Sequence, residues 1–112
     1  MGKNQLGEFE EIVMLTVAIL AGDAYGFAII EEIENRLKRK VSIGSLQTVL
    51  RRLEDKGFLK SALGESTAVR GGKRKRFFQL TAAGQVILRE TKEQRMELWN
   101  AIPDFAMKFT TN

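Results

Sequence analysis

Residues 42 to 59, SIGSLQTVLRRLEDKGFL, carry the clearest helical pattern in the chain. Apolar residues recur there at intervals of three and four, which places them on one side of an α-helix. Ser42 or Ser45 is suited to cap the start of this helix, and Gly57 is suited to end it in a left-handed conformation. The four residues expected to face the core are Leu46, Val49, Leu50 and Leu53.

The opposite face of the same helix carries residues that suit a DNA major groove. Small and amide side chains near its start can approach base edges, and arginines behind them can approach phosphates. An ordinary amphipathic surface helix would show the same apolar stripe, so this helix alone leaves both interpretations open. The polar face includes Gly44, Ser45, Gln47, Thr48, Arg51 and Arg52.

The charges of the chain are segregated along the sequence. Residues 36 to 76 hold 13 of the 18 Lys and Arg residues but only three of the 14 Asp and Glu residues. A solvated charge run would explain residues 38 to 40, but it does not explain a third of the chain with one sign. A basic middle between acidic ends indicates a surface that binds a polyanion.

Several classes of function are excluded by what the sequence lacks. The 112 residues suffice for one domain and include no cysteine and no histidine, which removes the usual zinc sites, thiol nucleophiles and imidazole catalysis. Neither paired catalytic carboxylates nor a phosphate-binding loop is present. There is no run of about 18 apolar residues and no signal peptide. We therefore expect a cytoplasmic protein that is not an enzyme and has no cofactor, metal or membrane partner.

Two helices are predicted before residue 42. The first covers residues 6 to 20 and is apolar almost all round from Ile12 onward. We expect one of its sides to pack inward and the other against a second subunit, with complete burial in a single core as the alternative. The second is predicted from residue 25 or 26 to residue 38. Its expected buried residues are Phe27, Ile30, Ile33 and Leu37.

After Gly57 the pattern changes to that of a β-hairpin. Residues 58 to 63 and 74 to 80 are predicted strands around a polar loop, and a period of two places Phe78 and Leu80 on one side. The runner-up interpretation of GGKRKR is a localisation signal or flexible tail, which its position between two strand patterns disfavours. Cations gather at the tip and on the second strand: Arg70, Lys73, Arg74, Lys75 and Arg76.

The last helix is predicted from a Thr81 cap to about Ala101, with Pro103 ending it. It is apolar at its root and at its far end but polar between, which is typical of an arm that is covered by a partner subunit. We therefore divide the chain into a DNA-binding domain at residues 1–80 and a dimerisation helix with tail at residues 81–112. The expected interface residues are Phe9, Val13, Val17, Met96, Trp99 and Ile102.

These elements predict a mainly α-helical fold with a small β-hairpin, in the order of a winged helix-turn-helix with an extra C-terminal dimerisation helix. Short sequence blocks between about residues 12 and 90 resemble the PadR family of bacterial transcriptional regulators, and the single helix after the hairpin resembles its compact subfamily. The blocks are Tyr25-Gly26, Gly44-Ser45-Leu46, Leu50-Arg51-Arg52-Leu53-Glu54 with Gly57, Gly71-Gly72-Lys73-Arg74-Lys75, Phe77-Phe78 and Leu80-Thr81 with Gly84.

The resemblance implies a homodimeric repressor whose third helix enters the major groove of double-stranded DNA while the hairpin, or wing, follows the backbone. This chain has Gln47-Thr48 where the family usually has Tyr-Pro, and Phe77-Phe78 where it often has Tyr-Tyr. Gln47 is suited to read adenine. The residues assigned to DNA are Ser42, Gly44, Ser45, Gln47, Thr48, Arg51, Arg52, Lys73, Arg74 and Lys75.

Such regulators commonly respond to a small aromatic or drug-like effector near the dimer interface. Trp99 is the residue of this chain best suited to stack on one, although a plain interface anchor explains it more simply. A winged-helix module that binds protein or RNA is the alternative function.

Overall fold

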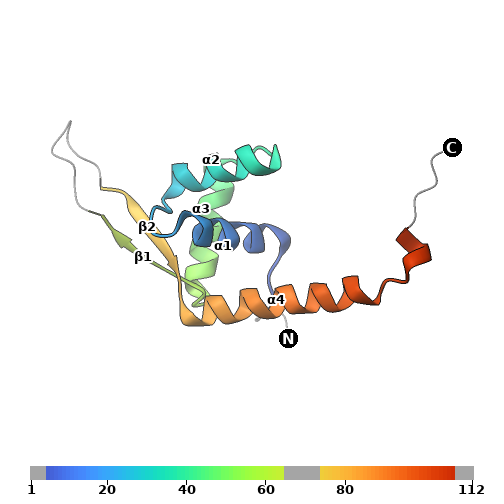
Figure 1. Ribbon diagram of the computed structural model, residues 1–112. Helices are drawn as coiled ribbons and strands as arrows, with labels where there is room; N and C mark the ends of the chain where they lie inside the picture. Colours follow the sequence, from blue (N-terminus) through green and yellow to red (C-terminus); the bar gives the residue numbers. More distant parts are fainter. Residues whose placement is uncertain (1–4, 65–73, 108–112) are drawn as a thin grey trace.

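The computed structural model describes residues 5–64 and 74–107. A three-helix body carries the hairpin at one end, and a long helix runs beneath the body and projects beyond it (Figure 1). The elements are α1 (Glu8–Leu20), α2 (Gly26–Leu37), α3 (Ile43–Asp55), β1 (Leu59–Leu63), β2 (Arg76–Leu80), α4 (Ala82–Ala101) and the short 3₁₀ helix η2 (Asp104–Met107). Within the described residues, no helix combines the length and the apolarity that a membrane span requires.

The predicted mainly α-helical fold with one antiparallel hairpin is confirmed. The core lies where α1, α2 and α3 meet the buried face of the hairpin, because each of these elements contributes apolar side chains to one cluster. Its largest fully buried side chains are Met14, Ile29, Ile33, Leu46, Leu53 and Val13.

The prediction for α3 is confirmed in detail. All four residues of its apolar stripe are buried. The Ser42 hydroxyl caps the helix by accepting the Ser45 N–H at 3.1 Å, and Gly57 follows the helix end with a φ of 82°. A positive φ favours glycine, so the end of this helix is encoded locally.

The prediction for α2 is only partly right. Ile33 is buried, but Phe27 is 77% exposed and Leu37 is also exposed, while Ile29 takes their place in the core. Phe27 lies two residues before Ile29, about 200° around the helix, and therefore points away from the core. Leu37 is the last residue of α2 and lies beyond the main packing contact.

The prediction for the outer face of α1 needs a correction. Val13 and Val17 are 0% and 2% exposed within their own chain, so they have no surface left to bury against a second subunit. They lie four residues apart and share the face that packs on the core. The large apolar residues that α1 does leave exposed are Leu15 and Ile19.

The hairpin is anchored on the helices. Its strands pair antiparallel from Leu59 opposite Leu80 to Leu63 opposite Arg76. The Phe78 N–H donates to the Ala24 carbonyl at 2.8 Å, which fixes β2 to the turn between α1 and α2. Phe78 is buried and Leu80 half-buried, as the period of two predicts.

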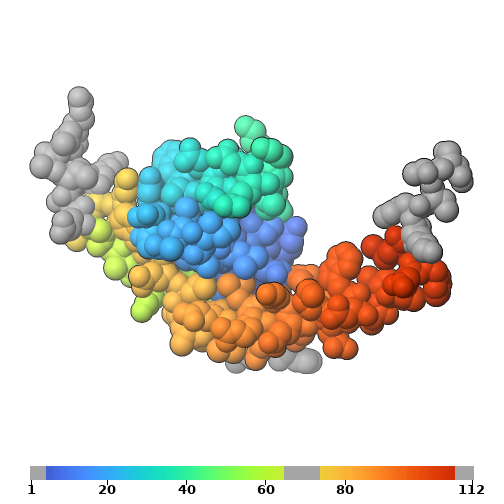
Figure 2. Space-filling model, in the orientation of Figure 1, coloured from blue at the N-terminus to red at the C-terminus, as the bar shows by residue number. Residues whose placement is uncertain are grey.

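The last helix begins and ends where the sequence places it. The Thr81 hydroxyl caps α4 by accepting the Gly84 N–H at 2.9 Å, and Pro103 follows the extended residue Ile102. Its first turns pack into the core, whereas its second half extends past the body (Figure 2). The molecule is accordingly elongated, with extents of 60 × 37 × 22 Å. Residue 81 marks where the arm begins; the division into two domains stays a prediction.

Candidate nucleic-acid interface

A groove between α3 and β2 brings the predicted reading helix and the predicted wing together. Gln47 and Arg51 line it from α3, and Arg76 lines it from β2. All three side chains belong to exposed residues. The groove encloses about 440 Å³ and has both hydrogen-bonding and cationic groups along it. It is therefore a surface on which an amide and two guanidinium groups can face one ligand.

The first turn of α3 is open above this groove. None of the described atoms lies within 4 Å of the point where a Cβ on Gly44 would stand, so packing does not require a glycine there. Ser42 donates its hydroxyl to Ser45 Oγ at 2.9 Å, and these two residues are thus tied to each other. Gly44, Ser45 and Thr48 are exposed, as a surface for base contacts requires.

Two hairpin cations that the structure describes, Lys75 and Arg74, are held at the loop end of the strands. Lys75 places its Nζ 4.1 Å from the ring centroid of Tyr25, the residue that precedes α2, in a cation–π contact. Arg74 donates its Nε–H to the Gly64 carbonyl at 2.7 Å. Lys73 lies outside the described residues. The wing thus carries Lys75 beside the start of α2, where the turn before α2 meets β2.

Three described cations from the basic middle of the sequence are paired with acids. Arg36 pairs with Glu32, Arg39 pairs with Glu8 at 3.2 Å, and Lys56 pairs with Glu10 at 2.9 Å. The first pair is local to α2, whereas folding brings Glu8 and Glu10 of α1 to Arg39 and Lys56. Charges that are segregated along the sequence are therefore partly mixed in space. The expected polyanion-binding surface stays a prediction, and Arg36, Arg39 and Lys56 also serve ion pairs within the chain.

The pair between Glu10 and Lys56 ties the end of α3 to α1. Burial of Glu10 would by itself raise the pKa of its carboxyl group. The Gly7 N–H at 2.8 Å, the Lys56 ammonium and the nearby Arg52 guanidinium outweigh burial and hold that pKa below its ordinary value of 4.5. Arg52, which the sequence assigns to DNA, therefore also acts on an acid of the protein itself.

Sequence reasoning left Arg76 out of the predicted site. The alternation of the strand could have identified it, because Arg76 precedes Phe78 by two residues and thus lies on the same face of β2. That face looks toward α3, so Arg76 lines the groove between α3 and β2.

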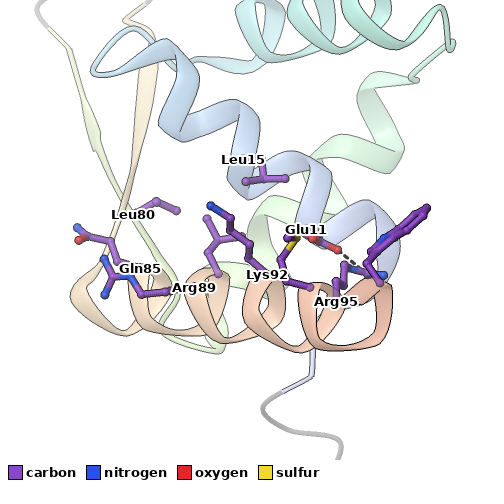
Figure 3. Close-up of a pocket in the computed structure, with 10 residues that line it drawn as sticks. Glu11, Leu15, Leu80, Gln85, Arg89, Lys92 and Arg95 are labelled. Atoms are coloured by element: carbon purple, nitrogen blue, oxygen red, sulfur yellow. Dashed lines mark hydrogen bonds and ion pairs between the residues drawn. The ribbon is translucent and has the colours of Figure 1, made fainter. Parts of the chain in front are cut away.

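A second groove lies between α1 and α4 (Figure 3). It encloses about 590 Å³, and Glu11 on α1 pairs with Arg95 on α4 across it at 2.7 Å. Two predicted interface residues, Met96 and Trp99, belong to its lining. The whole lining is Glu11, Leu15, Leu80, Gln85, Leu88, Arg89, Lys92, Arg95, Met96 and Trp99.

The other predicted interface residues lie close to this arm or to α1. Ile102 is half-buried and lines a shallow depression with Arg95, Leu98 and Trp99. Phe9 is half-buried, and its ring lies 5.4 Å from the guanidinium carbon of Arg39.

Comparison with solved structures finds the same fold. A PadR-like transcription factor from Bacteroides fragilis matches with a TM-score of 0.69 and 28% identity, over 82% of this chain and 84% of that one. A PadR family transcriptional regulator from Eggerthella lenta matches with a TM-score of 0.67 and 24% identity, over 91% and 88%.

Comparison of sequences points the same way. An uncharacterized protein from Lysinibacillus sphaericus is 32% identical over 101 residues, which are 88% of each chain. The model of the transcriptional regulator PadR-like family matches residues 14–90, from α1 into α4, and so includes α3 and the hairpin. The chain therefore belongs to the PadR-like family of DNA-binding transcriptional regulators.

Proposed function

We propose that this protein is a homodimeric repressor that places α3 in the major groove and the hairpin on the DNA backbone. The observation that carries the proposal is the groove shared by α3 and β2, where Gln47, Arg51 and Arg76 face the same space. A helix supplies side chains for base edges, and cations on either side of it supply backbone contacts.

The roles of the individual residues follow from their positions. Gln47 and Thr48 lie in the exposed first half of α3 and are assigned to base edges, with Gln47 suited to adenine. Arg51 lies one turn further and is assigned to a base or to the neighbouring phosphate. Lys75, beside Tyr25 at the start of α2, is assigned to the backbone. Ser42, Gly44, Ser45, Arg52, Lys73 and Arg74 complete the proposed contact surface.

Dimerisation accounts for the apolar surface that the arm leaves open. Trp99 is 60% exposed, and Met96 and Leu98 are exposed near it on α4. Soluble monomers rarely expose such a cluster, and a twofold dimer would bury the same cluster of both subunits. Met96, Trp99 and Ile102 remain in the proposed interface, and Leu15 and Ile19 replace Val13 and Val17.

A small aromatic effector that relieves repression would fit the groove between α1 and α4. Leu15, Leu88, Met96 and Trp99 offer apolar contacts there, and Trp99 offers a face for stacking. Bound at this position, the effector would touch the same residues that the dimer needs, which couples its binding to the relative position of the two subunits.

The test is a binding titration in which the protein is added to duplex DNA from the region upstream of its own gene. Fluorescence anisotropy of the DNA measures binding, and the titration is repeated at a series of salt concentrations. We expect log K to fall with log[salt] by about 0.9 for each phosphate contacted. Arg51→Ala should weaken binding and reduce the preference over random duplex, whereas Lys75→Ala should weaken binding to both duplexes alike. Arg36→Ala is the matched control, because Arg36 is a cation already paired with Glu32.

An equal loss on both duplexes from Arg51→Ala and Lys75→Ala would contradict these separate roles. If the protein binds neither duplex but does bind structured RNA or another protein, the proposed function is wrong. The winged helix would then be a binding module for that RNA or protein. A footprint on the same DNA would give the half-site spacing, which a dimer requires to be a helical turn or a multiple of it.

A further inference from the structure

One serine of the hairpin connects the wing to the reading helix. Ser61 on β1 accepts a hydrogen bond from Arg76 Nη1–H at 3.0 Å and donates its own hydroxyl to Glu54 Oε2 at 2.7 Å. Glu54 belongs to α3, and Arg76 belongs to β2. Three elements of the proposed DNA surface are therefore joined by two consecutive hydrogen bonds.

The strand register explains why Ser61 meets Arg76. Ser61 is paired with Phe78, and Arg76 is paired with Leu63. Arg76 is thus the diagonal neighbour of Ser61 on the same face of the hairpin, at a distance that a long side chain spans. That face looks toward α3, so the hydroxyl of Ser61 can reach Glu54 as well.

The chemistry of a hydroxyl group fixes the order of donors and acceptors, from Arg76 through Ser61 to Glu54. A serine hydroxyl has one proton to donate and two lone pairs to accept with. Donation to the Glu54 carboxylate orients the hydroxyl and leaves a lone pair for Arg76. Since Arg76 has five N–H groups and this contact uses one, the guanidinium keeps donors for a second acceptor.

The carboxylate acts on Arg76 through the hydroxyl. A direct Glu–Arg pair would engage two N–H groups of the guanidinium in the bidentate form and neutralise its charge at close range. The intervening Ser61 holds the guanidinium in place while keeping the carboxylate one hydrogen bond further away. The charge of Arg76 is therefore less offset by the carboxylate at the groove that it shares with Gln47 and Arg51.

We propose that Arg76 is a DNA-backbone contact and that Ser61 and Glu54 are positioning residues, which hold its guanidinium at a set distance from α3. This inference rests on the proposed function. Holding a long side chain before binding saves the entropy of ordering it on the DNA, which is about 0.5–1.5 kcal/mol for such a side chain. Loss of the positioning should therefore weaken binding about two- to tenfold without removing the contact.

The experiment compares Arg76→Gln, Ser61→Ala, Ser61→Thr and the double variant Ser61→Ala/Arg76→Gln in the salt titration described above. Arg76→Gln should lower the salt slope by about 0.9 for each subunit bound. Ser61→Ala should weaken binding about two- to tenfold and leave the salt slope unchanged, because the cation is still present. Ser61→Thr keeps the hydroxyl and should restore binding, and the double variant should bind no worse than Arg76→Gln alone.

Lys60→Gln is the matched control. Lys60 is the preceding residue of β1, and its side chain points to the other face of the hairpin. Its effect should be independent of Ser61→Ala, so the two free-energy changes should add. Thermal unfolding of every variant is measured alongside, and the titration is run where each is fully folded.

Two results would overturn the inference. The first is a salt slope in Arg76→Gln equal to that of the natural protein, which would mean that Arg76 contacts no phosphate. The second is simple addition of the effects of Ser61→Ala and Arg76→Gln, which would mean that Ser61 does not act through Arg76. Failure of the natural protein to bind any duplex is a different result, and it would overturn the proposed function itself.

Discussion

At the start of α3, Gly44 occupies a helical position where a side chain would meet no described atom within 4 Å. Glycine costs a helix about 1 kcal/mol relative to alanine, and nothing in the packing of the described residues compensates for that cost. Glycine at this position would let DNA approach the backbone of α3 closely, since the first turn of α3 lies on the proposed DNA surface.

Gly44→Ala is predicted to separate stability from binding. The protein should become more stable by up to about 1 kcal/mol, because alanine favours the helix. Affinity for the upstream duplex should fall, because the new methyl group stands where the DNA comes closest. Urea unfolding and the anisotropy titration, both at one protein concentration, measure the two effects. Equal or tighter DNA binding by this variant would show that Gly44 does not serve close approach.

A second residue, Glu10, makes stability depend on pH. Its carboxyl group has a lowered pKa in the folded protein, and the unfolded value is near 4.5. A lowered folded-state pKa contributes stability above the unfolded pKa, and this contribution is lost as the pH falls through the folded value. Glu10 therefore stabilises the fold at neutral pH and stops doing so in acid.

Glu10→Gln is predicted to cost about 2 kcal/mol at pH 7, because Lys56 and the Gly7 N–H lose a charged acceptor. The difference in melting temperature between Glu10→Gln and the natural protein should be constant above about pH 5 and shrink below 4.5. Circular dichroism melts from pH 7 to pH 3 measure it. Glu31→Gln, at an exposed glutamate of α2, is the control and should show no such trend. A difference that is the same at all pH values would refute the assignment.

At the scale of an element, α4 is positioned by the contact between its first turn and Phe58, the residue before β1. A Cβ on Gly84 would lie 2.1 Å from the Phe58 carbonyl oxygen. That carbonyl also accepts the Thr81 N–H at 3.1 Å and is therefore held in place. The direction in which the arm leaves the body thus depends on the absence of one side chain.

Gly84→Ala is predicted to destabilise the fold by about 3 kcal/mol, because backbone must move to admit the methyl group. Denaturant unfolding at a fixed protein concentration measures the loss. The control is the same substitution at Gly44, where space is open and the change in stability should be small or of opposite sign. Similar stability for both variants would mean that the contact at Phe58 can relax.

At the scale of the whole molecule, the chain is too extended to be a compact monomer. Its radius of gyration is 17.4 Å, against about 13 Å for a compact domain of this length. The second half of α4 leaves the body and carries exposed apolar residues (Figure 2). A twofold partner would cover that half, and this is the physical basis of the proposed dimer.

Trp99→Ala is predicted to raise the dimer dissociation constant about 30-fold, the effect of losing a hot spot worth about 2 kcal/mol. Sedimentation velocity over a dilution series measures it. Phe27→Ala is the control, since Phe27 is a large exposed apolar residue on α2, away from the arm. Equal effects of the two substitutions, or no effect of Trp99→Ala, would place the interface elsewhere.

The sequence by itself determined the elements and most of their ends, although the first helix begins at residue 8 and not 6, and the second strand at residue 76 and not 74. The stripe of α3, its Ser42 cap, the Thr81 cap of α4 and the stop at Pro103 are all encoded within a few residues of where they act. Local signals of this kind depend on backbone geometry, which does not change with the surroundings. The same holds for the period of two that placed Phe78 inward.

Only the tertiary structure decided which face of each helix packs on the core and which ion pairs and hydrogen bonds its charged side chains form. Val13 and Val17 face the core, and Phe27 does not, because the roll of a helix is set by the elements that pack on it. Lys56 meets Glu10, and Arg76 reaches Glu54 through Ser61, across distances in sequence that no local pattern records. Some cations of residues 36 to 76 therefore form ion pairs and hydrogen bonds within the chain, and others belong to the proposed DNA surface. Folding decides between the two, because it brings their partners together from distant segments.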